Sequence, residues 1–126
     1  MEFNFKKVLN LEQRKEEFQK LKGKLSSKIP IICEKDPRSP IEAISKTKFL
    51  VNPQMNVSAF NEIIRKKLNL ESNQGLFLLI KGKNAVTGNQ TMQEIYDHFK
   101  DEDGFLYITY SSESVWGSQM NFNLKC

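Results

Sequence analysis

Few residues in this sequence have types and spacing that could support chemistry, and the most informative of them is Gly117. It follows a strand-like segment and a polar stretch, and residues 118–126 come after it. Glycine lacks a Cβ, so its carbonyl is open to attack and its backbone can thread a narrow enzyme cleft. Gly117 is therefore either a simple chain breaker or a reactive terminus that a protease exposes.

The remaining reactive side chains do not suggest a catalytic or metal site. His98 is the single histidine, and it falls on the polar side of a short predicted helix, which favours a surface position over a role as a base. An enzyme is therefore the weakest interpretation, and we expect no metal. Cys33, inside a predicted strand, and Cys126, the last residue, make a poor disulfide framework and suit a reducing cytosol.

Composition predicts one domain with a basic N-terminal segment. The 126 residues are 39% hydrophobic, which is enough for a single core, and the apolar runs are too short for a signal peptide or membrane span. Residues 1–30 hold eight Lys and Arg against four Asp and Glu, whereas residues 31–126 hold eleven of each. This imbalance suggests an acidic partner, an anionic surface, or only a solvated helix face. RNA binding is a weaker alternative, because aromatic and basic residues do not interleave as a stacking platform requires.

The periodicity of apolar residues predicts the elements that would position these residues. In chain order they are helices over 2–9 and 11–22, strands over 28–35 and 46–51, a helix over 57–68, a strand over 76–80, a helix over 92–99, and a strand over 105–110. Asn56 can cap the third helix, and Thr91 with Glu94 can form a capping box on the fourth. Pro30 is expected to limit ladder pairing in the first strand.

This order predicts an α+β fold, a ubiquitin-like β-grasp with two extra N-terminal helices. Its sheet would be mixed and four-stranded, with the first and last strands parallel and central. The helix over 57–68 would cover one face, and the N-terminal helices would cover part of the other. The strand over 46–51 alternates, so that Lys46, Lys48 and Leu50 face one side while Phe49 and Val51 face the other.

Five segments then occur in an informative order behind the two helices. They are Lys28-Ile-Pro-Ile-Ile, Lys46-Thr-Lys-Phe-Leu-Val, Ile63-Ile-Arg-Lys-Lys-Leu, Asn73-Gln74 before Leu76-Phe-Leu-Leu, and Lys100-Asp-Glu-Asp-Gly-Phe-Leu-Tyr107. Each alone is unspecific. Together the chain resembles the ubiquitin-like modifiers of autophagy, the family of autophagy-related protein eight that includes light-chain-3 and GABARAP-like proteins.

The resemblance implies covalent attachment to a lipid. A cysteine protease would cut between Gly117 and Ser118, and activating and conjugating enzymes would pass the glycine carboxylate to phosphatidylethanolamine, with no other cofactor. The implied organisation is a helical extension over 1–25, the β-grasp over 26–110, a flexible arm over 111–117 and a propeptide over 118–126. The protein would be a cytoplasmic monomer that moves to autophagosomal membranes after lipidation, with no nucleic-acid partner.

The resemblance also implies that cargo receptors and adaptors carrying aromatic-x-x-aliphatic motifs add a strand along residues 46–51. The implied aromatic pocket comprises Glu17, Leu21, Pro30, Ile32, Lys48, Leu50 and Phe105. The implied aliphatic pocket comprises Phe49, Val51, Phe60, Ile63 and Ile64. The implied contacts for acidic residues of the motif are Lys28, Lys46 and Lys48. For Ile32, Ile63 and Ile64, a place in the core is an equally good interpretation.

Several residues depart from the family's pattern. Asn52 stands between the strand over 46–51 and Pro53, whereas in the family proline usually follows this strand directly. Phe60 replaces a more usual leucine, which would make the aliphatic pocket shallower. Lys67, the implied protease contact, stands where arginine is frequent and is a poorer bidentate donor. Trp116 stands where phenylalanine or tyrosine is commoner. One alternative is therefore the related modifier with a Trp-Gly terminus that is joined to proteins, and another is a β-grasp interaction module that is never lipidated.

Overall fold

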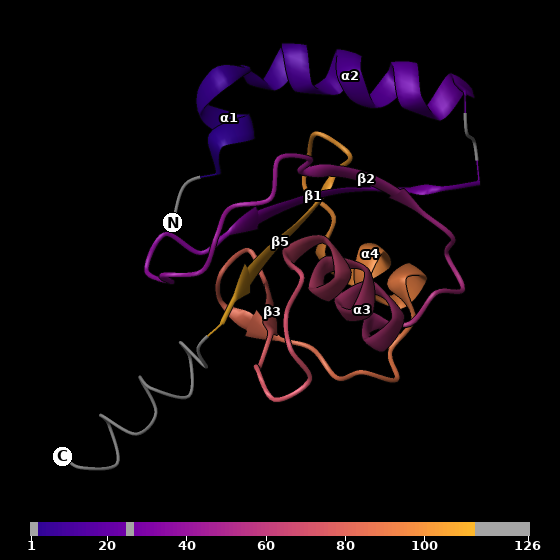
Figure 1. Cartoon of the computed structure of the whole chain (residues 1–126). Helices are drawn as coiled ribbons and strands as arrows, with labels where there is room; N and C mark the ends of the chain where they lie inside the picture. Colours follow the sequence, from indigo (N-terminus) through magenta and orange to yellow (C-terminus); the bar gives the residue numbers. More distant parts are fainter. Residues whose placement is uncertain (1–2, 25–26, 113–126) are drawn as a thin grey trace, which may run out of the picture.

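A mixed sheet at the centre of the molecule organises the fold (Figure 1). The structure, a computed structural model, describes residues 3–24 and 27–112. Its elements are α1 (Asn4–Val8), α2 (Leu11–Lys24), β1 (Ile29–Lys35), β2 (Lys48–Val51), α3 (Val57–Leu68), β3 (Phe77–Ile80), β4 (Asn84–Ala85), α4 (Met92–Phe99) and β5 (Leu106–Ser111). Within the described residues, no helix combines the length and the apolar character that crossing a membrane requires.

The strand order in the sheet is β2-β1-β5-β3-β4. β1 and β5 are parallel, with Ile32 opposite Tyr107, and every other neighbouring pair is antiparallel. The predicted ubiquitin-like β-grasp is thus confirmed, but the prediction of four strands was wrong. The strand that was not predicted is β4. It has two residues and pairs antiparallel with β3 after a turn through Lys81 and Gly82, both at positive φ. Two residues are too few to show an alternating pattern in the sequence.

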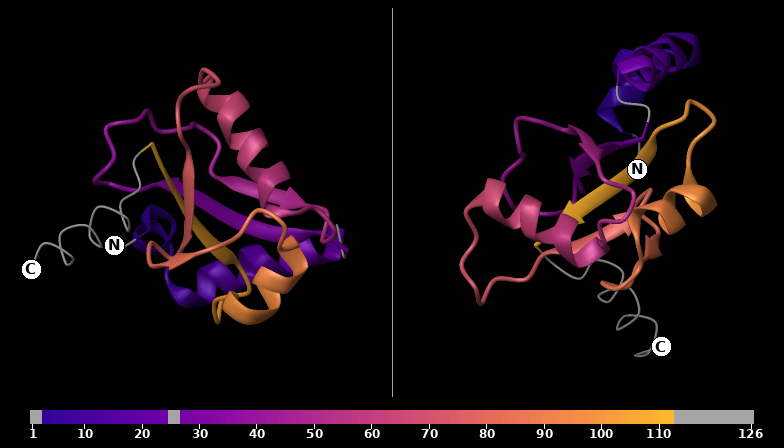
Figure 2. Two further views of the ribbon diagram at one scale, coloured as in Figure 1. Left: turned by 90° about the horizontal axis from the view of Figure 1, so that it is seen from below. Right: turned by 90° about the vertical axis from the view of Figure 1, so that its right-hand side faces the viewer.

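Helices cover both faces of the sheet, as predicted (Figure 2). α3 and α4 lie on one face and close the main core, whereas α1 and α2 lie on the opposite face. The smaller cluster beneath α1 and α2 contains the buried side chains of Phe3, Ile32, Phe105 and Tyr107, and Phe5, Phe18 and Leu21 pack against it. The N-terminal helices therefore complete a second core of their own and are held to the sheet by apolar contacts.

The helix boundaries follow the capping signals in the sequence. α3 spans the predicted residues, and the Asn56 side chain accepts a hydrogen bond from the backbone N–H of Ala59 at 2.9 Å. Asn69 ends α3 in the left-handed conformation, which asparagine tolerates. Thr91 and Glu94 form the predicted capping box at the start of α4.

Each of the four predicted strands begins one or two residues later in the structure than predicted. β2 begins at Lys48, so the predicted strand over 46–51 was two residues too long at its start. Ahead of Lys48 only one hydrogen bond, from Cys33 N–H to the Thr47 carbonyl at 2.8 Å, continues the ladder before the chain diverges. Pro30 lies opposite Leu50 of β2, and the parallel ladder with β5 begins at the next residue, Ile31. Proline thus occupies a position at which β5 requires no N–H donor.

Candidate functional site

β2 forms one edge of the sheet and is the natural starting point for a binding site. It pairs with β1 on one side, and it is the first strand in the sheet order, so its other side has no partner strand among the described residues. An edge strand presents N–H and C=O groups that an extended peptide can pair with. Burial alternates along β2: Lys48 and Leu50 are half-buried, while Phe49 and Val51 are buried. The predicted two-sided strand is confirmed for these four residues, but the predicted side of Lys46 was wrong: Lys46 precedes β2, and its Nζ lies over the Phe49 ring.

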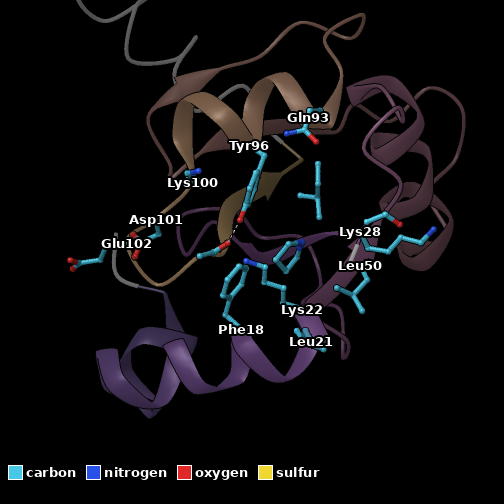
Figure 3. A pocket seen from close by; sticks show the side chains of 14 residues that line it. Phe18, Leu21, Lys22, Lys28, Leu50, Gln93, Tyr96, Lys100, Asp101 and Glu102 are labelled. Carbon is cyan, nitrogen blue, oxygen red and sulfur yellow. Dashed lines mark hydrogen bonds between the residues drawn. The ribbon is translucent and has the colours of Figure 1, made fainter. Parts of the chain in front are cut away.

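On the α2 side of β2 the structure contains a cavity of about 650 Å³ (Figure 3). Three residues of the implied aromatic pocket, Leu21, Pro30 and Leu50, line it. Ile32 and Phe105 are fully buried in the cluster beneath α1 and α2 instead. The last two, Glu17 and Lys48, form an ion pair at 3.6 Å with both side chains more than one-third exposed. The seven residues thus lie in one region: three line the cavity, two are buried beneath it, and two form an ion pair at its edge.

The cavity extends beyond the residues that sequence reasoning selected. Phe18 and Lys22 of α2, Gln93, Tyr96 and Lys100 from α4 and its end, and Gly104 also line it. Figure 3 shows the α2 side chains on one side of the space and those of α4 on the other. The sequence places Phe18 and Tyr96 on the apolar stripes of their helices. It gives no signal that the two stripes approach each other, because this depends on how both helices pack on the sheet.

On the α3 side of β2 the implied aliphatic pocket is filled by the protein itself. Phe49, Val51, Phe60 and Ile64 belong to the main core, and Ile63 is only half-buried. The rings of Phe49 and Phe60 meet edge to face with centroids 5.6 Å apart. The larger ring at position 60 therefore occupies space beside β2, and Ile63 is the member of this set that a ligand would reach first.

Lysines surround both sides of the strand. The Nζ atoms of Lys46 and Lys67 each lie 5.6 Å from the centroid of the Phe49 ring, and Lys48 Nζ lies 5.5 Å from that of Phe5. Lys28 is exposed and lines the cavity. Lysine over an aromatic face is a weak contact of about 0.5–1 kcal/mol at exposed sites, so these cations can be drawn to a carboxylate. Lys46 and Lys67 thus both border the Phe49 ring on the aliphatic side of β2.

A buried polar network fixes α1 and α2, and α2 forms one wall of the cavity. Arg14 Nε donates to Asp103 Oδ2 at 2.7 Å, and the Tyr107 hydroxyl donates to the same oxygen at 2.5 Å. Lys6 pairs with Asp101 at 2.7 Å. Glu34 accepts hydrogen bonds from two backbone N–H groups at the start of α1. The predicted turn over residues 101–104 therefore anchors the helices.

The pKa shifts in this network favour a charged Asp101, a charged Arg14 and a neutral Tyr107. Burial would raise the pKa of Asp101, but the hydrogen bond from Lys6 and the nearby charges of Lys6 and Lys81 outweigh it and lower the pKa. Burial acts to lower the pKa of Arg14, but the hydrogen bond to Asp103 raises it overall. The pKa of Tyr107 is raised, first by burial and then by its hydrogen bond to Asp103. Tyr107 is therefore a neutral donor at physiological pH.

The other candidate residues are placed as follows. Gly117 and Trp116 lie outside the described residues, which end at Ser112, directly after β5. His98 is exposed, with its Nδ1 2.8 Å from the Glu94 carbonyl oxygen. Burial raises the pKa of the Cys33 thiol, which favours an unreactive side chain. The described part of the chain contains no group of three or more His, Cys, Asp or Glu side chains suited to a metal ion.

The geometry of a β-grasp with two N-terminal helices agrees with the result of comparison with known families. Residues 13–117 match the family described as autophagy protein Atg8, ubiquitin like. The chain belongs to the Atg8 family. Its match ends at the glycine that the sequence analysis selected, and it includes α3, α4 and every strand of the sheet.

Individual relatives agree with this assignment. The chain is 40% identical to autophagy-related protein 8 of Schizosaccharomyces pombe over 122 residues, covering 97% of this chain and 100% of that protein. It is 39% identical to human microtubule-associated protein 1 light chain 3 gamma over 114 residues, covering 90% and 78% respectively. Its fold is similar to the crystal structure of Trypanosoma brucei ATG8, with a TM-score of 0.82, 33% identity, and coverage of 88% of this chain and 95% of that one. The chain is therefore an Atg8-family ubiquitin-like protein of autophagy.

Proposed function

We propose that this protein is a modifier that is processed after Gly117 and joined to phosphatidylethanolamine. The observation that carries the proposal is the family match over residues 13–117, which stops at this glycine and leaves residues 118–126 outside it. The last described strand, β5, ends at Ser111, and five residues, 112–116, separate it from Gly117 in the sequence. An enzyme cleft could therefore receive the glycine without unfolding the sheet.

The proposed cycle requires five chemical steps. The thiolate of a cysteine protease attacks the Gly117 carbonyl, the amide nitrogen of Ser118 leaves with a proton, and water releases the Gly117 carboxylate. An activating enzyme joins that carboxylate to AMP from ATP with loss of pyrophosphate. A cysteine thiolate of the activating enzyme displaces AMP to give a thioester. A cysteine thiolate of the conjugating enzyme then takes over the acyl group and releases the first thiolate. The lipid amine then attacks the thioester, releases the thiol and leaves an amide. Two acyl chains hold a protein at a membrane stably where one is marginal.

The second half of the proposal is that β2 recruits cargo receptors and adaptors by adding a peptide strand. The unpaired edge of β2 would supply backbone hydrogen bonds. The aromatic side chain of the motif would enter the cavity at Leu21, Pro30 and Leu50, and its aliphatic side chain would contact Ile63. Acidic residues of the motif would pair with the exposed lysines around the strand. The protein would act as a cytoplasmic monomer before lipidation and on autophagosomal membranes afterwards.

The experiment that tests attachment is the intact mass of the protein recovered from its native cells under starvation. We expect a species that ends at Gly117 and carries the mass of a phosphatidylethanolamine, sensitive to phospholipase D. Gly117→Ala should abolish both processing and lipidation, while Ser118→Ala, the matched control, should retain them. Recovery of only the full-length, lipid-free chain would refute the attachment. It would favour the unlipidated interaction module, for which the free edge of β2 would suffice.

A further inference from the structure

The cavity beside β2 is larger than a pocket for one aromatic side chain. Its volume is about 650 Å³, within the range of roughly 300–1,000 Å³ of small-molecule sites. It runs from Leu21, Pro30 and Leu50 to the space between α2 and α4, bordered by Gln93 and Tyr96 (Figure 3). The part near α4 lies beyond every residue that the peptide motif is expected to contact.

The walls of this inner part are apolar and aromatic. Phe18 is half-buried and its ring rests edge-on against Phe105, with centroids 6.0 Å apart. Across the space, the Tyr96 hydroxyl donates to the Gly104 carbonyl at 2.7 Å. Because that hydrogen bond already satisfies the hydroxyl, Tyr96 offers mainly its ring to a ligand. Gly104 packs against the Phe18 ring, since a Cβ at that position would lie 2.6 Å from it, so a flat apolar ligand would contact the Tyr96 ring together with Pro30 and Leu50.

The charges around the cavity favour an anion. Lys22, Lys28 and Lys100 line it, and among the described residues none of them makes an ion pair. Of its two carboxylates, Asp101 is paired with Lys6 at 2.7 Å and with Lys81 at 3.7 Å. The other carboxylate, Glu102, is exposed and makes no ion pair with another described residue. Three uncompensated cations thus face one uncompensated carboxylate.

We propose that this cavity binds a small amphipathic anion, an aromatic or polycyclic carboxylate or sulfonate. Its rings lie against Tyr96, Pro30 and Leu50, and its acid group pairs with Lys22 and Lys100. Because the cavity includes Leu21, Pro30 and Leu50, the bound anion excludes the aromatic side chain of a docked peptide. Such a ligand thereby regulates peptide recruitment. The competition rests on the proposed docking function, whereas binding of the anion does not.

The probe for this test is 8-anilinonaphthalene-1-sulfonate, which combines two ring systems with one sulfonate. Titrated into the folded full-length chain, it should give a saturable, one-site rise in fluorescence. Its amide chemical-shift changes should concentrate in residues 18–22 and 93–104. A double variant, Lys22→Ala with Lys100→Ala, should weaken binding roughly 3- to 10-fold, as expected for two partly exposed ion pairs. The matched control, Lys66→Ala with Lys83→Ala, removes two exposed lysines outside the cavity and should leave binding unchanged.

Equal weakening in both double variants, or shift changes spread over other surfaces, would overturn the proposed site. So would the absence of saturable binding by the wild-type chain. A second titration adds an aromatic-x-x-aliphatic peptide, which should displace the probe. A peptide that binds without displacing it would show that the anion does not regulate docking. A peptide that fails to bind would refute the docking function and the competition with it, while the anion site would stand on the first titration.

Discussion

Replacement of Arg14 by methionine should cost about 3 kcal/mol of folding free energy. Arg14 is 8% exposed, and it donates to Asp103 at 2.7 Å and to the Leu9 carbonyl at 2.8 Å. Removing one partner of a buried ion pair costs about 3–5 kcal/mol, because the other charge is left uncompensated. Asp103 is 1% exposed but keeps hydrogen bonds from Tyr107 and from the Phe105 backbone, so the lower end of that range applies.

Urea unfolding followed by circular dichroism measures this difference directly. Lys15→Met is the matched control, since Lys15 is exposed on the same helix, and it should change stability by less than 0.5 kcal/mol or thereabouts. Asp103→Asn in the Arg14→Met background should restore part of the loss, because it removes the unpaired buried charge. A loss below about 1 kcal/mol, or no recovery from the second substitution, would contradict the assignment of this pair as a structural anchor.

Three further variants test other parts of the structure. Leu50→Ala with Lys48→Ala should weaken motif-peptide binding at least roughly tenfold by calorimetry with little change in melting temperature, since both side chains are half-buried; unchanged affinity would mean that the peptide docks elsewhere. Phe60→Leu should lower the free energy of unfolding by about 1–2 kcal/mol and increase the affinity for peptides with a large aliphatic residue, because it opens space beside β2. Unchanged affinity would contradict the idea that the Phe60 ring fills the aliphatic pocket. Because the pKa of Asp101 is lowered from its ordinary value of 3.8, its ionised form stabilises the fold at pH values above 3.8. This contribution is lost as the pH falls through the folded-state pKa. Asp101→Asn should therefore flatten the loss of stability below pH 3.8 in acid titrations, and an unchanged slope would argue against the role of its contact with Lys6.

The sequence predicted those features that depend on local patterns. Alternation along β2, the Asn56 cap and the Thr91–Glu94 capping box each involve residues within a few positions of one another. From these the element order and the β-grasp followed. β4 was missed because two residues carry no period, and the start of β2 was misplaced because Lys46 continues the alternation without pairing.

The features that escaped prediction depend on contacts between distant segments. Arg14 and Asp103 are 89 positions apart, and their sequence surroundings indicate only a charged helix and a turn. Whether a side chain such as Ile64 lines a pocket or fills the core depends on what covers it. Here the core covers it, as one of the two interpretations anticipated. The depth of the cavity depends on the approach of α2 to α4, which neither helix specifies by itself.

The strand order also decides how the protein would carry mechanical load. β5 has hydrogen-bonded neighbours on both sides, parallel β1 and antiparallel β3, and the chain continues from it toward Gly117. Tension applied from a membrane would act along β5, so both rows of hydrogen bonds would be sheared together, since they lie across the strand. A receptor bound at β2 would apply its force through the β2–β1 hydrogen bonds to the parallel β1–β5 pair. Under the proposed lipid attachment, such a tether would resist unfolding without a disulfide among the described residues.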